Sequence, residues 1–150
     1  KLLQGWRESL ILSASQLGWL GSSPKEFNGL SRLETLRKRR IEPPMPPLGH
    51  EAYLHAYWMA LGCALPGVSG PERLSPMFIE SWGRGTKKEL SGFEFQVLLD
   101  MSQAYVNMQF AGRQFSCAPP YGDPDLCVDR ESVSKKIDRH FQSFINSRRK

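Results

Sequence analysis

Residues 74–121 decide the fold class, and they read LSPMFIESWGRGTKKELSGFEFQVLLDMSQAYVNMQFAGRQFSCAPPY. Within them, Ser75 and Pro76 supply an N-cap and a proline at the first helical position. Ser91 and Glu94 have the spacing of a capping box, in which each side chain bonds the other's backbone N–H. Apolar residues then recur at three- and four-residue spacings, as on one face of a helix. The stretch therefore predicts two helices joined by the basic loop GRGTKKE and followed by a proline-rich segment.

Similar signals predict helices on the N-terminal side of this stretch. Residues 1–17 have the spacing of a one-sided helix, which we expect to end at Gly18. Residues 50–65 indicate another helix, with bulky residues such as Tyr57 and Trp58. Two further helix starts follow from capping signals, namely Ser23 with Pro24 and Glu26, and Ser31 with Glu34.

A last helix is expected near the C-terminus, where Asp129 can act as its N-cap. Its apolar face comprises Val133, Ile137, Phe141 and Phe144. No alternation of apolar and polar residues runs long enough to indicate a sheet. We therefore expect an all-α fold, a small bundle of about five to six helices.

The proline-rich segment PPMPP at residues 43–47 is the best internal boundary, because proline fixes φ and removes a backbone donor. Charge changes at the same place: residues 1–42 carry net +4, residues 43–129 net −4 and residues 130–150 net +5. These shifts predict a basic helical N-terminal arm (1–42), a helical core (43–129) and a basic C-terminal helix (130–150).

Composition limits the class of protein. The 150 residues are 40% hydrophobic and 23% charged, which is typical of one folded domain rather than a disordered chain. No apolar run approaches the ~20 residues that a membrane span needs. Three cysteines without a CxxC motif indicate reduced thiols and a cytoplasmic location, with a Cys117–Cys127 bridge as the weaker alternative.

Catalytic and metal-binding patterns are missing from the sequence. His50 and His55 in HEAYLH lie five residues apart, whereas a zinc-binding helix places its two histidines four apart on one face. Asp123, Asp125 and Asp129 lack the central glycine and final glutamate of a calcium loop. No nucleophile elbow occurs either. We expect a protein without catalytic residues, metal or cofactor.

The residues from Pro43 to Tyr121 resemble those of tail assembly chaperones, which are small proteins of long-tailed bacteriophages. In that pattern a proline-rich start and a helix precede a Gly/Pro loop, a short helix ending near tryptophan and a longer helix. The resemblance covers about half of the chain. The matching residues are PPMPPL (43–48), GPERLSP (70–76), IESW (79–82), Leu90, Glu94, Leu98, MSQAY (101–105) and APPY (118–121).

The resemblance implies a non-enzymatic tail assembly factor, located in the host cytoplasm, that coats the helical tape-measure protein while the tail tube polymerises. Trp82, Phe93 and Tyr105 would then line a groove for the partner's helix, which implies an exposed apolar patch. The basic ends would set the orientation of the partner by charge.

Two alternatives stay open on the sequence alone. A phage or mobile-element regulator would bind nucleic acid through the basic ends, and a structural component of the virion would dock its N-terminal arm on a neighbour, including another copy of itself. The basic patch predicted for nucleic-acid binding comprises Arg37, Lys38, Arg39, Arg40, Lys135, Lys136 and Arg139.

Overall fold

The protein has a mainly α-helical fold. Its structure, a computed structural model, describes residues 1–126 and 138–139. The expected all-α class is confirmed, with one small hairpin added. The α-helices of this part are α1 (Leu2–Gly21), α2 (Arg32–Lys38), α3 (Ala52–Ala60), α4 (Pro76–Gly85) and α5 (Gly92–Ala111). A 3₁₀ helix spans Lys25–Phe27, and the strands are β1 (Leu65–Gly67) and β2 (Gly70–Glu72).

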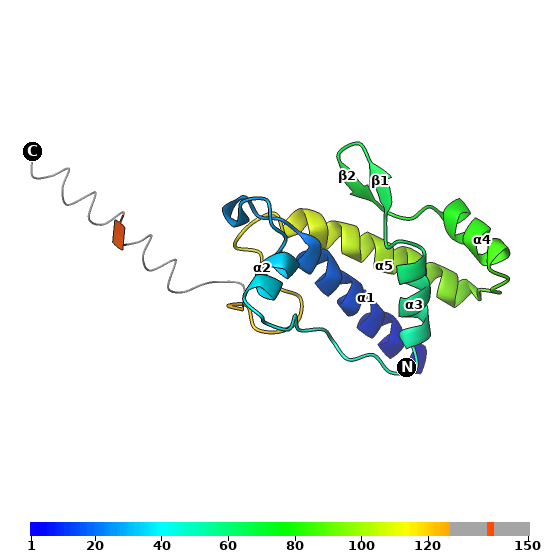
Figure 1. Cartoon of the computed structure of the whole chain (residues 1–150). Coiled ribbons are helices and arrows are strands. Elements are labelled where there is room, and N and C mark those ends of the chain that lie inside the picture. Colours follow the sequence, from blue (N-terminus) through cyan, green and yellow to red (C-terminus); the bar gives the residue numbers. More distant parts are fainter. Residues whose placement is uncertain (127–137, 140–150) are drawn as a thin grey trace, which may run out of the picture.

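Helices α1 and α5 lie side by side and form the centre of the molecule (Figure 1). They run in the same direction, because Arg7 is paired with Asp100, whereas Gly21, later in α1, lies against Gln109, later in α5. Helix α4 lies at one end of this pair and α2 at the other (Figure 1).

Gly18 does not end α1, contrary to the expectation from sequence, and the helix continues to Gly21. The glycine serves packing instead: a Cβ at Gly18 would collide with the backbone carbonyl of Tyr105 in α5. The extra turn buries Trp19 and Leu20 almost completely.

Residues of the predicted N-terminal arm contribute to the apolar core. Leu10 and Ala14 of α1 belong to the main apolar cluster, which also includes Leu54, Trp58 and Leu98. A second cluster joins Trp19 and Leu20 to Leu36 of α2.

The segment PPMPP is without helix or strand, as expected from its prolines, and it is held against α1. The buried Gln16 side chain donates to the carbonyl of Pro44 (2.9 Å) and accepts from the backbone N–H of Tyr121 (3.1 Å). One glutamine therefore holds two distant segments against the helix pair.

Two predicted capping boxes are confirmed. Ser31 and Glu34 bond each other's backbone at the start of α2, and Ser91 and Glu94 do so at the start of α5. Ser75 caps α4 by accepting from the N–H of Phe78, as expected.

The capping signal at Ser23 was a wrong prediction of a helix start. Residues 25–27 form only a 3₁₀ turn without a side-chain cap. The chain leaves this turn through Asn28 (φ 53°) and Gly29 (φ 84°), both in the left-handed conformation, so the turn does not continue into an α-helix.

The helix expected over residues 50–65 is shorter than predicted, because Gly62 takes a left-handed φ of 89° just after α3. Residues predicted as loop then form the antiparallel hairpin β1–β2, in which Leu65 pairs with Glu72. Gly70 of this hairpin lies against the ring of Phe110. The predicted final helix lies outside the described residues, apart from two helical residues at 138–139.

Candidate partner-binding cleft

A cleft of about 470 Å³ opens between α4, the loop after it and the start of α5. We call it the α4–α5 cleft. Three apolar side chains, Ile79, Leu90 and Phe95, contribute to its lining. The other lining residues are Glu80, Gly83, Arg84, Lys87, Lys88 and Glu89. The cleft therefore combines apolar surface with charges of both signs.

The helical period places four lining residues of α4 on the side of the helix that faces the cleft. Ile79 and Gly83, four residues apart, form its buried stripe, and Glu80 and Arg84 lie on one flank of that stripe. Gly83 is needed for the loop to return close to the helix, since a Cβ there would lie 3.3 Å from the carbonyl oxygen of Lys88. Glu80 and Arg84 make a long, exposed ion pair of 3.8 Å, which contributes little stability.

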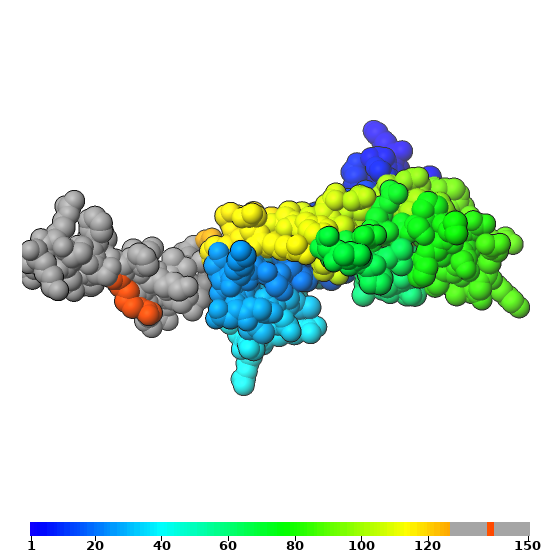
Figure 2. Space-filling view, turned by 90° about the horizontal axis from the view of Figure 1, so that it is seen from above, coloured from blue at the N-terminus to red at the C-terminus, as the bar shows by residue number. Residues whose placement is uncertain are grey.

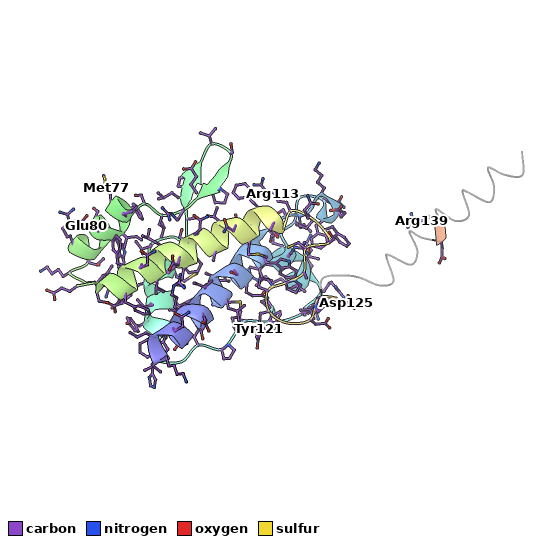
Figure 3. The ribbon with its side chains drawn as sticks, turned by 180° about the vertical axis from the view of Figure 1, so that it is seen from behind. Met77, Glu80, Arg113, Tyr121, Asp125 and Arg139 are labelled. Atoms are coloured by element: carbon purple, nitrogen blue, oxygen red, sulfur yellow. The ribbon has the colours of Figure 1, made fainter. Side chains whose placement is uncertain are left out.

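Apolar side chains are exposed at this end of the molecule. On α4, Met77 is 78% exposed and Phe78 is 41% exposed. Figure 3 shows Met77 and Glu80 together on α4, with Glu80 being a residue of the cleft. Val68 at the turn of the hairpin and Met59 of α3 are exposed as well, but neither lines the cleft. Met77 therefore adds exposed apolar surface next to the charged cleft.

The three predicted partner-binding residues are half-buried and pack against the main apolar cluster. Trp82 packs on Tyr57 of α3, with ring centroids 5.5 Å apart. Because it lies four residues after Phe78, it occupies the flank of α4 opposite to Glu80 and Arg84. None of the three residues lines the α4–α5 cleft. Their role in partner binding stays a prediction.

Tyr105 lies far along α5 from that flank, and its ring meets Trp58 edge-on at 5.5 Å. Its hydroxyl accepts a hydrogen bond from Gln109 at 2.8 Å, and burial raises its pKa. The structure therefore does not bring Tyr105 to the surface that the cleft occupies.

The predicted basic patch is placed only in part. Arg37, Lys38, Arg39 and Arg40 are exposed at the end of α2, where Arg39 donates to the carbonyl of Leu126. Figure 2 shows the cyan part of the chain projecting at the lower edge of the molecule, away from the green α4 region at the right. Arg139 is exposed, whereas Lys135 and Lys136 lie outside the described residues.

Unlike the other basic residues of this segment, Arg32 is buried. Its guanidinium lies 4.5 Å from the centre of the Trp19 ring and donates to the carbonyls of Gly112 (3.0 Å) and Gln114 (2.9 Å). It links α2 to the end of α5. Sequence reasoning counted Arg32 only as charge, and its place directly after an N-cap gave no signal of burial.

Histidine, cysteine and acidic side chains are the titratable groups that hold metal ions in proteins. No cluster of three or more His, Cys, Asp and Glu residues occurs among residues 1–126 and 138–139. Burial lowers the pKa of His55 and raises that of the Cys63 thiol to about 11, which keeps the thiol protonated. Cys117 is a free thiol, and Cys127 lies outside the described residues.

No helix in the described ranges is long and apolar enough to cross a membrane.

The chain matches no protein-family model, no curated protein and no solved structure. The fold and the cleft therefore define it as a small, mainly α-helical protein with a candidate site for a partner.

Proposed function

We propose that this protein is a non-enzymatic phage tail assembly factor that binds a helical protein in the α4–α5 cleft. The observation that carries the proposal is the cleft itself, in which apolar side chains lie within a charged rim beside the exposed Met77. Amphipathic helices bind grooves of this kind by inserting apolar side chains spaced by one turn. The resemblance of residues 43–121 to tail assembly chaperones supplies the class of partner, a long helical tail or tape-measure protein.

The size of the cleft supports binding of a few side chains rather than of a whole domain. Its volume of about 470 Å³ lies within the usual range for specific sites, which is roughly 300–1,000 Å³. Burial of apolar surface would provide the free energy of binding, and the charged rim would fix the orientation of the partner.

The first test is an affinity pull-down of the tagged chain from host cells that produce its neighbouring genes, washed at low and at high salt. We expect one long helical tail protein to remain at high salt, because apolar burial is only weakly salt-dependent. Nucleic acid retained only at low salt would contradict the proposal and favour the regulator, since phosphate contacts weaken steeply with salt.

A pair of variants locates the contact. Leu90→Asp puts a charge on the apolar lining of the cleft, and Phe78→Asp puts the same charge on the opposite flank of α4. We expect Leu90→Asp to lose the tail protein and Phe78→Asp to retain it, with thermal melts confirming that both are folded. The reverse result would move the site to the flank of Trp82. Recovery of the protein from purified particles would indicate a structural component instead.

A further inference from the structure

The turn that closes the C-terminal end of α4 contains a lysine in a backbone conformation that favours glycine. Lys87 has φ 53°, and the turn is closed by hydrogen bonds from Lys88 N to Gly83 O (2.9 Å) and from Lys87 N to Arg84 O (3.2 Å). This is the pattern of a Schellman motif, whose left-handed position is usually occupied by glycine because a Cβ is strained there.

Helix α2 ends in the same way on Arg40, which has φ 57°. Its closing bonds run from Ile41 N to Leu36 O (3.0 Å) and from Arg40 N to Arg37 O (3.0 Å). The two helix ends are therefore matched in backbone geometry and in the sign of the side chain. They differ in position, because they lie at opposite ends of the α1–α5 pair (Figure 1).

The helix dipole does not require Lys87. A basic side chain near a helix C-terminus is favourable, but Arg84 already lies in the last turn of α4. The left-handed φ itself is needed to close the turn, but glycine would adopt it with less strain, so the turn does not require a lysine side chain there. What distinguishes Lys87 from Arg40 is that it lines the α4–α5 cleft.

The other cations of the cleft have contacts of their own. Arg84 is paired with Glu80, and the ammonium of Lys88 lies 4.4 Å from the centre of the Tyr57 ring. No hydrogen bond, ion pair or ring contact is formed by the Lys87 ammonium within residues 1–126 and 138–139. Lys87 is therefore the unpaired cation of the lining, while Glu89 of the same lining is an exposed carboxylate that forms no hydrogen bond or ion pair within the described residues.

We propose that the partner segment of the α4–α5 cleft is an amphipathic helix with an acidic residue within one turn of its apolar anchor, and that Lys87 binds this carboxylate. The proposal rests on the proposed function and names the chemistry of its partner. Apolar side chains of the helix contact Ile79, Leu90 and Phe95 while its carboxylate meets Lys87, so that charge complementarity fixes its direction in the cleft.

The test uses the full chain and an mRNA-displayed library of random peptides of about 16 residues, enough for four helical turns. Peptides enriched on the wild-type chain are sequenced, and the strongest is labelled for fluorescence anisotropy. We expect enriched sequences to combine apolar residues with Asp or Glu at helical spacing. Enrichment of sequences without acidic residues would overturn the proposal.

The decisive variant is Lys87→Gly, and Arg40→Gly is its matched control. Both remove one positive charge and one strained φ, so both are expected to raise the melting temperature by about 3 °C. Only Lys87→Gly is expected to weaken peptide binding, by about tenfold. Equal peptide affinity of Lys87→Gly and the wild type would overturn the role of Lys87.

Leu90→Asp separates the failure of this inference from that of the proposed function. If Leu90→Asp abolishes peptide binding while Lys87→Gly leaves it unchanged, the cleft is a binding site and only the carboxylate contact is wrong. If a folded Leu90→Asp binds the peptide like the wild type, the α4–α5 cleft is not the site, and both proposals fail.

Discussion

Gly18 of α1 lies directly against the backbone carbonyl of Tyr105 in α5. A Cβ on Gly18 would also come within 3.1 Å of the Met108 side chain. This contact between a glycine and a backbone lets the two parallel helices approach closely, and every element that carries the α4–α5 cleft is built on that pair.

Gly18→Ala is expected to destabilise the protein by about 2–3 kcal/mol, because backbone atoms cannot move aside as a flexible side chain can. Gly5→Ala in the same helix is the control, since a Cβ there meets nothing within 4 Å. It should stabilise the protein by roughly 0.5–1 kcal/mol through helix propensity. Urea unfolding followed by circular dichroism measures both, and equal effects would contradict the close-packing role of Gly18.

Arg32→Lys is expected to cost about 2–3 kcal/mol. An ammonium cannot reproduce the forked hydrogen bonds to the carbonyls of Gly112 and Gln114, nor the flat contact with Trp19. Arg37→Lys, at an exposed position of α2, should stay within about 0.5 kcal/mol of the wild type. Chemical denaturation measures the pair, and a neutral Arg32→Lys would show that the buried guanidinium contributes charge alone.

Glu94→Gln is expected to lower the melting temperature at pH 7 and to do so less at pH 3. Burial raises the pKa of Glu94, but hydrogen bonds from Tyr53 and from Ser91 outweigh it and lower the pKa below its usual 4.5. The stability that ionised Glu94 contributes is therefore complete above pH 4.5 and is lost as the pH falls through the lowered pKa. Differential scanning calorimetry from pH 7 to 3 tests this.

The matched control for that series is Glu42→Gln, at an exposed glutamate outside any helix cap. A difference between wild type and Glu94→Gln that stays constant over the whole pH range would contradict the role of the ionised carboxylate.

The wild-type melting temperature is expected to fall as the pH drops from 7 to 5, and His55→Gln should reduce that fall. Burial lowers the pKa of His55, and its Nε2 atom is buried without a hydrogen-bond partner among the described residues. The folded state therefore favours neutral imidazole, so that this stability is present above pH 6.5 and is lost as the pH falls toward the lowered pKa. Thermal melts across this range measure it, with the exposed His50→Gln as control; an unchanged slope in His55→Gln would refute it.

Features that depend only on neighbouring residues could be predicted from the amino-acid sequence alone. Capping boxes at Ser31 and Ser91 act over three residues, and proline at Pro76 fixes its own φ, so these helix starts follow from local chemistry. The periodic apolar residues after Ser91 likewise predicted α5, one of the two 20-residue helices, and the mainly helical class.

Tertiary structure decided what each ambiguous residue does. Glycine can end a helix or let two helices touch, and only the approach of α5 selects the second role for Gly18. Arg37 is exposed to solvent, whereas Arg32 is buried. The burial of Arg32 could not be predicted locally, because the carbonyls that accept its hydrogen bonds belong to residues about 80 positions away. The cleft itself joins Ile79 to Phe95 across a folded loop, so its apolar surface and the position of Lys87 arise only when the helices pack.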